Sequence, residues 1–314
     1  MAVLDVAVVI VSHNTADLLD ACLTSLAQGG LAGVTAGVWV VDNASTDGSV
    51  ARVRERHPGV RLIASAVNLG FSGANNRALQ AAGFAARPGD GARVAARDDA
   101  VPPARHALVL NPDTVVPPEA VAKLVAVLDA EPDVGIVGPK LVLADGTLDL
   151  ACRRAFPTPA VAFYRFTGLA RLFPKSRRFG RYNMTFLDPD TPSDVDSVVG
   201  ACMLVRGAAI ADVGLLDERF WMYGEDLDWA LRVRRAGWRV VYRPHVVVHH
   251  VKRAASRRSP RAAFEFQRAM WLFYQKHYAA STPRWTHALV VLGLALRGGP
   301  RLVRAMRSDR GDPA

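Results

Sequence analysis

Short apolar runs alternate with amphipathic segments over the first 130 residues of the chain. The apolar runs are rich in β-branched residues, as in strands buried on both faces, and cover residues 6–11, 38–41, 60–64 and 106–110. Apolar positions recur at helical spacing over residues 16–27, 50–56, 77–84 and 119–129. A polar loop follows each run. This order predicts an α/β fold in which helices flank a doubly wound, mostly parallel central sheet.

The pattern is less regular after residue 130. Further strands are expected at residues 134–137, 140–143, 195–205, 239–242 and 246–250. Residues 85–106, rich in Pro, Gly, Asp and Arg, indicate a surface insertion. Residues 153–192 contain five prolines and a basic run from 171 to 181, which favours a mobile segment on the acceptor side or a plain surface loop.

An acidic and aromatic stretch at residues 214–229 precedes a predicted helix. Glu225, Asp226 and Asp228 follow Gly224 and fall in the first helical turn, where the helix dipole stabilises negative charge. Asp226 and Trp229 are three residues apart and share one helix face. A carboxylate beside aromatic rings is partly desolvated, which suits a general base. An acidic N-terminal turn on a solvated helix is the alternative interpretation.

The length and the cysteines limit the possible classes of protein. At 314 residues, half of them hydrophobic, the chain is long enough for one large α/β domain or two small ones. Cys22, Cys152 and Cys202 are far apart, which argues against a disulfide framework or a cysteine-built zinc site and fits a reducing compartment. The first residues lack the basic start of a signal peptide and predict a buried strand instead.

Positive charge is concentrated in the last fifth of the chain. Residues 252–314 hold 13 of the 39 Lys and Arg residues but 3 of the 29 acidic ones. The amphipathic segment 261–278 is followed by an apolar segment, 285–296, which is shorter than the ~20 residues that span a bilayer. This tail predicts either an interfacial helix on an anionic membrane or a helix packed on the catalytic domain. Its aromatic residues lie in an apolar helix face, which argues against binding to nucleic acid.

Polar clusters follow the predicted strands at residues 12–15, 42–47, 68–76 and 111–113. Ligands of open parallel sheets bind at the carboxyl ends of the strands, so these clusters form a candidate site. Carboxylates with a nearby His suit a hard divalent ion such as Mg²⁺ or Mn²⁺, which in turn holds phosphates. The glycine fingerprint of dinucleotide-binding proteins, the phosphate-binding loop and a Ser-His-Asp set do not occur at these positions.

Five motifs carry a resemblance to a known family. They are Val-Val-Ile-Val-Ser-His-Asn at 8–14, Val-Asp-Asn-Ala-Ser-Thr-Asp-Gly at 41–48, Asn-Leu-Gly-Phe-Ser-Gly-Ala-Asn-Asn at 68–76, Leu-Asn-Pro-Asp at 110–113 and Glu-Asp-Leu-Asp-Trp at 225–229. In order and spacing, over residues 4–250, the chain resembles the family 2 glycosyltransferases with a GT-A fold. Within that family it is most similar to bacterial rhamnosyltransferases of lipid-linked or cell-wall glycans.

The resemblance implies a role for each matching residue. Asp226 would be the general base. The substrate-binding set would be Ser12, Asn14, Asp42 and Asp47 around the nucleotide, Asn76 and Asn111 near the nucleotide sugar, and Glu225, Asp228 and Trp229 near the acceptor. Asp113 matches the second acid of the family's Asp-x-Asp metal motif, whose first position is Asn111 here. His249 or His250 would complete the metal shell, and the resemblance favours His249. Glu225 and Asp228 could instead cap the helix, and Trp229 could pack in the core.

The resemblance therefore implies an inverting, metal-dependent sugar transferase. The favoured donor is dTDP-rhamnose, with UDP-hexose or GDP-mannose as alternatives. The acceptor would be a polyprenyl-diphosphate-linked or cell-wall glycan, met by a cytoplasmic enzyme peripheral to the inner face of the cell membrane. Residues 1–115 would bind the nucleotide sugar, 116–251 would bind the acceptor and carry catalysis, and 252–314 would form the basic helical tail. A non-catalytic glycan-binding module on the membrane remains the alternative from another class.

Overall fold

One sheet organises the molecule. The computed structural model describes residues 3–85, 104–251 and 260–309. In that part of the chain the sheet has nine strands in the order β3-β2-β1-β4-β8-β6-β9-β5, with β7 paired to β9. The strands are β1 (Leu4–Ser12), β2 (Ala36–Asn43), β3 (Arg61–Ser65), β4 (Ala104–Leu110), β5 (Thr114–Val115), β6 (Val134–Leu143), β7 (Ser193–Asp194), β8 (Cys202–Arg206) and β9 (Arg239–His250).

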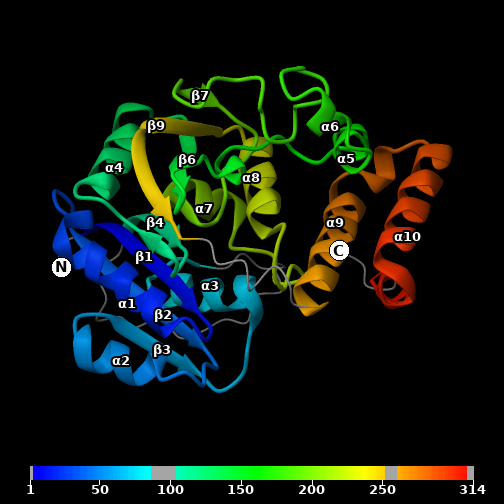
Figure 1. Ribbon diagram of the computed structural model, residues 1–314. Helices are drawn as coiled ribbons and strands as arrows, with labels where there is room; N and C mark the ends of the chain where they lie inside the picture. Colours follow the sequence, from blue (N-terminus) through cyan, green and yellow to red (C-terminus); the bar gives the residue numbers. More distant parts are fainter. Residues whose placement is uncertain (1–2, 86–103, 252–259, 310–314) are drawn as a thin grey trace.

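Helices flank this sheet, and a helical pair lies at one end of the molecule (Figure 1). The helices are α1 (Ala16–Ser25), α2 (Ser49–Arg56), α3 (Gly70–Ala81), α4 (Ala120–Ala130), α5 (Pro159–Phe166), α6 (Leu169–Leu172), α7 (Gly207–Val213), α8 (Glu225–Arg235), α9 (Pro260–His277) and α10 (Arg284–Ser308). A π-helical turn (Leu26–Gly30) and two 3-10 turns (Leu150–Cys152, Ala279–Ser281) complete the regular structure of the described residues.

The strand directions confirm the predicted α/β class. β1 pairs in parallel with β2 and β4, and β2 pairs in parallel with β3, as the alternation of strands and helices predicted. β8 then runs antiparallel between β4 and β6, while β6 and β9 are parallel to each other. The sheet as a whole is therefore mixed, and the carboxyl ends of β1, β2 and β4 lie at the same edge.

The third helix begins earlier than the pattern predicted. α3 starts at Gly70 rather than at residue 77, because side chains from neighbouring loops accept hydrogen bonds from its first backbone N–H groups. Asn43 Oδ1 accepts from Leu69 N at 2.7 Å, and Asn68 Oδ1 accepts from Gly70 N at 3.0 Å. Most of the polar cluster at 68–76 is consequently helical.

Several predicted strands have different bounds. Residues 134–137 and 140–143 join into β6 with a register shift at Pro139, and residues 239–242 and 246–250 join into β9. The strand predicted at 195–205 shortens to β8, because the preceding residues turn to donate Gly200 N to the Asp226 carboxylate. Most of the predicted insertion, residues 86–103, lies outside the described residues.

The basic C-terminal region forms a helical pair. α9 places Phe273 in the main core, and α10 packs on α9 through a second cluster that includes Trp271, Leu294 and Leu302. Within the described ranges, no helix combines the length and the apolar character needed to cross a bilayer.

A buried carboxylate fastens α9 to α8. Asp228 is fully buried and accepts hydrogen bonds from Arg232 Nε at 2.8 Å and from His277 Nε2 at 2.7 Å, and it forms an ion pair with Lys276 at 2.7 Å. Burial alone would raise the pKa of Asp228, but the hydrogen bond from His277 and the two cations outweigh it and hold the pKa below its usual range. The negative charge of α8 thus requires the cationic end of α9.

Removing that carboxylate should weaken the whole domain. Asp228→Ala leaves Lys276 and Arg232 without their buried partner, so we expect the free energy of unfolding in urea to fall by about 3–5 kcal/mol. Lys123→Ala, which breaks the exposed Lys123–Glu119 pair on α4, is the control and should cost less than about 1 kcal/mol. Similar losses for the two variants would contradict this account of Asp228.

Candidate functional site

Asp42 is the last residue but one of β2 and lies beside the end of β1. It is 2% exposed, and its Oδ1 accepts from Ser45 N at 3.0 Å. Its Oδ2 is buried, and no group of the described residues donates to it. Ser12 pairs with Asp42 across the two strands, and its Oγ bonds to Thr15 Oγ1 at 2.8 Å. A buried carboxylate oxygen without a donor is costly, so this position fits a ligand N–H such as that of a nucleobase.

Asn14 and Asp47 tie the loop after β1 to the loop after β2. Asn14 Oδ1 accepts from Thr46 N at 2.8 Å, while Asp47 Oδ2 accepts from Ala16 N at 2.8 Å. Burial would raise the pKa of Asp47, but its hydrogen bonds from Ser49 and Ala16 outweigh this and lower the pKa. Ser12, Asn14, Asp42 and Asp47 therefore come together at one edge of the sheet, and Asp47 organises the loops there.

Asn76 holds α3 to the loop before α8. It is 1% exposed; its Nδ2 donates to Leu216 O at 2.8 Å and to Glu218 Oε1 at 3.0 Å, and its Oδ1 accepts from Leu216 N. Its amide is thus used within the protein, and contact with the sugar stays a prediction. Gly70, at the start of α3, has φ of 77°, and a Cβ there would lie 2.5 Å from Trp221, so this close approach requires glycine.

A single turn joins the predicted base to the predicted metal motif. Gly200 N donates to Asp226 Oδ2 at 3.0 Å, and the carbonyl of the next residue, Ala201, accepts from Asn111 N at 3.0 Å. Asp113 lies two residues beyond Asn111. The turn at residues 198–201 therefore brings α8 and the end of β4 together, although more than one hundred residues separate them in the sequence.

Arg154 is a functional residue that the sequence analysis missed. Its Nη2 donates to Asp226 Oδ2 at 2.6 Å, and both side chains are nearly buried. The other carboxylate oxygen, Oδ1, accepts from Leu227 N at 2.7 Å. Arg154 lies at the start of the segment 153–192 that the pattern predicted to be irregular, so nothing in its neighbours marked it. Together these donors fix the orientation of the Asp226 carboxylate.

Glu225 is buried beside Asp226, and its carboxyl group has a raised pKa. It is 6% exposed, and no group of the described residues donates to its buried Oε2. Burial, and then the negative charge of Asp226, raise its pKa to about 8. Glu225 is therefore protonated at neutral pH and can donate a hydrogen bond, while Asp226 accepts.

Two of the predicted acceptor residues are turned into the protein. Trp229 is fully buried, and its indole Nε1 donates to Gly214 O at 2.9 Å, so it packs in the core and offers no ring face to a sugar. The Asp228 carboxylate is occupied by the α9 contacts described above. The spacing of Asp228 and Trp229 was compatible with contact to the acceptor or with a structural role. Their contacts within the protein give both residues a structural role.

His250, rather than His249, approaches Asp113. His250 Nε2 lies 3.2 Å from Asp113 Oδ1, and its Nδ1 lies 2.9 Å from Asp149 Oδ2. His249 is exposed, because successive side chains of β9 point to opposite faces of the sheet. The preference for His249 was therefore wrong. The carboxylates of Asp113 and Asp149 outweigh burial and raise the pKa of His250 to about 9.

Comparison with known proteins identifies the family of the chain. The model of the family described as "Glycosyltransferase like family 2" matches residues 4–272. The chain belongs to glycosyltransferase family 2. The structure also resembles a mannosyltransferase from Pyrobaculum calidifontis solved in complex with GDP-Man and Mn²⁺, with a TM-score of 0.52 and 17% identity over 98% of this chain and 85% of that one. This likeness confirms the GT-A fold.

Two relatives whose names state an activity are similar to this glycosyltransferase over more than half of its length. It is 32% identical over 253 residues to the N-acetylglucosaminyl-diphospho-decaprenol L-rhamnosyltransferase of Mycobacterium tuberculosis, which covers 81% of this chain and 78% of that one. It is 26% identical over 196 residues to a low-salt glycan biosynthesis hexosyltransferase of Haloferax volcanii, with 62% and 52% covered. The resemblance to rhamnosyltransferases is confirmed.

Asp113 and His250 fit a divalent ion in this glycosyltransferase. Neighbouring ligands of a six-coordinate ion with bonds of about 2.1 Å lie about 3.0 Å apart, close to the 3.2 Å that separates Asp113 Oδ1 from His250 Nε2. At the raised pKa of His250 both ring nitrogens hold a proton at neutral pH, so an ion would have to displace the proton of Nε2 while Asp149 keeps that of Nδ1. The described residues contain no group of three or more acidic, His or Cys side chains suited to a metal, so a substrate would have to complete the coordination.

Asp149 should matter for metal binding without touching the ion. Asp149→Asn weakens the bond that orients His250, and we expect the Kd for Mn²⁺, measured by isothermal titration calorimetry, to rise by about 10–100-fold. Asp145→Asn, in the exposed turn of the same hairpin, removes a carboxylate that bonds to Thr147 and should bind Mn²⁺ as the wild type does. Equal affinities for both variants would contradict the orienting role.

Glu225 should make stability fall as pH rises. Its folded pKa of about 8 lies above the ordinary glutamate value of 4.5, so between these values the folded state holds a proton that the unfolded state has lost. The free energy of unfolding then decreases by roughly 1.4 kcal/mol for each pH unit across that window. Glu225→Gln should lack this slope and be more stable than the wild type at pH 9. Parallel urea-unfolding profiles from pH 5 to pH 9 would refute the assignment.

Proposed function

We propose that this glycosyltransferase is an inverting, divalent-metal-dependent rhamnosyltransferase. It moves L-rhamnose from dTDP-rhamnose to a hydroxyl of a polyprenyl-diphosphate-linked or cell-wall glycan. The donor sugar is supported by the similarity to the rhamnosyltransferase of M. tuberculosis over most of both chains. The single structural observation behind the chemistry is the turn at 198–201, which bonds to Asp226 on one side and to Asn111 on the other.

Asp226 acts as the general base in this proposal. An acceptor hydroxyl has a high pKa, so a carboxylate within hydrogen-bond reach removes its proton as attack on the sugar carbon develops. Arg154, Gly200 and Leu227 hold the carboxylate oriented for that transfer. Glu225, protonated at neutral pH, donates a hydrogen bond to the acceptor. With one base and one displacement, the configuration at the sugar carbon inverts.

The donor binds at the edge formed by β1, β2 and β4. The free Oδ2 of Asp42 accepts the N–H of the pyrimidine base, and Ser12 and Asn14 lie beside the nucleotide. Asp113 and His250 would hold Mg²⁺ or Mn²⁺, which supplies a positive charge for the departing diphosphate when it is bound. Residues 1–115 thus serve the donor and residues 116–251 the acceptor and the base.

The proposal assigns a place as well as a reaction. The relative in M. tuberculosis is named for a decaprenol diphosphate acceptor, and the tail of this chain, residues 252–314, carries all of its net positive charge. We place the enzyme at the inner face of the cell membrane, peripheral to it. UDP-hexose and GDP-mannose are the second donor class, since the P. calidifontis neighbour was solved with GDP-Man. Membership of a glycosyltransferase family leaves little support for a non-catalytic glycan-binding module.

One pair of measurements tests donor and base together. Thermal-shift binding with dTDP-rhamnose, UDP-hexoses and GDP-mannose, each with Mn²⁺ or Mg²⁺, should show metal-dependent stabilisation by dTDP-rhamnose. Asp226→Asn should bind this donor but transfer its sugar about 10²–10⁴-fold more slowly, because the base is lost. Asp190→Asn is the matched control, because it removes an exposed carboxylate from the segment at residues 153–192 and should leave the transfer rate unchanged.

Either half of the proposal can fail by itself. Stabilisation by a different nucleotide sugar would replace the donor and leave the base in place. Full turnover of Asp226→Asn would remove Asp226 as the base. Undiminished transfer in EDTA would remove the metal.

A further inference from the structure

Exposed apolar side chains gather on three helices. Among the described residues, ten large hydrophobic side chains are exposed, and seven of them belong to α5, α6 or α10 or directly follow α6. They are Phe163, Leu172, Phe173, Trp285, Leu289, Leu292 and Leu296. Single exposed apolar residues are common on protein surfaces, but a concentration of this kind marks an interaction site.

The four residues on α10 form one stripe. Trp285, Leu289, Leu292 and Leu296 are spaced by four, three and four residues, so they share a single helix face. Trp285 is 70% exposed and Leu296 is 76% exposed. Leu294 and the opposite face pack against α9. The outer face of α10 therefore has no partner among the described residues.

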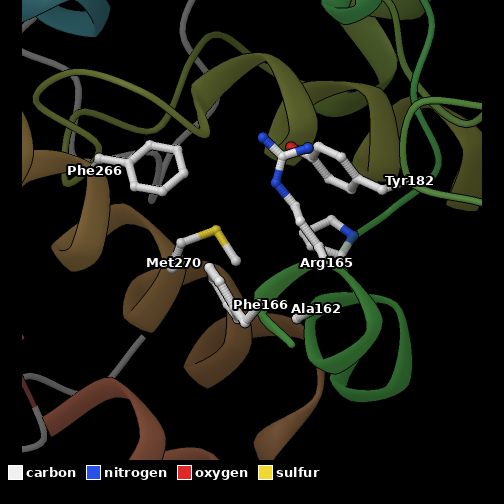
Figure 2. A pocket seen from close by; sticks show the side chains of 7 residues that line it. Ala162, Arg165, Phe166, Tyr182, Phe266 and Met270 are labelled. Atoms are coloured by element: carbon white, nitrogen blue, oxygen red, sulfur yellow. The ribbon is translucent and has the colours of Figure 1, made fainter. Parts of the chain in front are cut away.

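α5 and α6 lie beside this helical pair (Figure 1). The guanidinium of Arg297 on α10 stacks over the ring of Phe166 on α5 at 4.5 Å. Phe166 also lines a small pocket with Phe266 and Met270 of α9 (Figure 2). A segment from the middle of the chain thus extends the surface of the C-terminal helices. We call α5, α6 and the outer face of α10 the docking surface.

The charge around the docking surface has one sign. Residues 150–187 and 278–308 contain no Asp or Glu. Their exposed cations are Arg165, Arg171, Lys175, Arg177, Arg178, Arg181, Arg284, Arg297, Arg301, Arg304 and Arg307. Apolar side chains and cations in two segments that lack acids match the interface of an anionic bilayer, which presents hydrocarbon and phosphate together. Nucleic acid would leave the apolar stripe uncovered.

We infer that α5, α6 and the outer face of α10 dock together on an anionic membrane. Contact with the bilayer is then shared between the tail and the segment at residues 159–178, rather than confined to the tail. The inference rests on the proposed function only for the nature of the acceptor. A chain of contacts links the docking surface to the base: Tyr182 lines the pocket beneath α5 and interacts with Arg154, which pairs with Asp226. A lipid-linked acceptor held by the same bilayer would reach Asp226 from this side.

Vesicle flotation with the full-length protein tests the shared surface. The wild type should float with phosphatidylcholine vesicles that contain phosphatidylglycerol and remain behind with phosphatidylcholine alone. Replacing Leu172 and Phe173 together by Glu should lower the fraction bound to anionic vesicles about tenfold, although the tail is intact. Val3→Glu is the matched control, because Val3 is an exposed apolar residue directly before β1, and Figure 1 shows β1 well away from α5, α6 and α10.

Two further variants keep the test decisive. Lys175→Gln with Arg177→Gln should reduce the preference for phosphatidylglycerol without inserting charge into an apolar site. Deletion of residues 279–314 should weaken flotation but leave part of it. Thermal-shift binding of dTDP-rhamnose by each variant reports on its fold independently of membranes.

The outcomes separate docking from catalysis. If the Leu172 and Phe173 variant floats like the wild type while the deletion does not float, the tail docks alone and the inference is overturned. The inference is also overturned if the wild-type protein floats with neither kind of vesicle. Concentration-dependent dimers in solution would then identify a second copy of the chain as the partner of this surface. A protein that floats but binds no nucleotide sugar would refute the proposed function and leave the docking surface supported.

Discussion

Three carboxyl groups are buried within the first turn of α8, and the arrangement around them answers the cost of burying charge. Asp226 is paired with Arg154, Asp228 with cations from α8 and α9, and Glu225 avoids the cost by keeping its proton. The dipole at the start of α8 favours negative charge but cannot pay for three desolvated carboxylates. Arg154 and the end of α9 are distant from α8 in the sequence, so the pairings with Asp226 and Asp228 draw these two segments onto one helix.

The three acids differ in their bonding partners, and in the proposed function they also differ in their roles. A charged, oriented carboxylate and a neutral carboxyl at adjacent positions can act as acceptor and donor at the same pH. Asp228, two residues further along, holds α9 in place. In the proposed function, the same short stretch of sequence thus serves both chemistry and stability, according to how each carboxyl group is buried and paired.

Sequence patterns predicted the parts of the fold that depend on local order. The parallel strands β1–β4 and the convergence of Ser12, Asn14, Asp42 and Asp47 follow from apolar runs and the polar residues after them. The start of α3 was misplaced, because its first N–H groups are bonded by Asn43, at the end of β2, and by Asn68, just before the helix, while its N-cap residue Leu69 has no side-chain acceptor.

Long-range pairings account for what the sequence could not predict. His249 and His250 are equivalent as residue types, and only the facing of β9 against β5 selects His250. Arg154 looks like any other arginine of a basic loop until the fold brings it to Asp226. The spacing of Trp229 suited a ligand contact, but its side chain is buried in the core. In each case the deciding partner lies outside the local sequence window.

The cationic end of α9 has a consequence for engineering. Because Lys276 and His277 bind the buried Asp228 carboxylate, α9 cannot be exchanged freely, whereas α10 contributes no group to that pairing. The 3-10 turn at Ala279–Ser281 is thus a natural joint for chimaeras. Another amphipathic helix grafted beyond this turn would leave the pairing of Asp228 intact, but it would have to cover Trp271 and Tyr274 of α9 as α10 does.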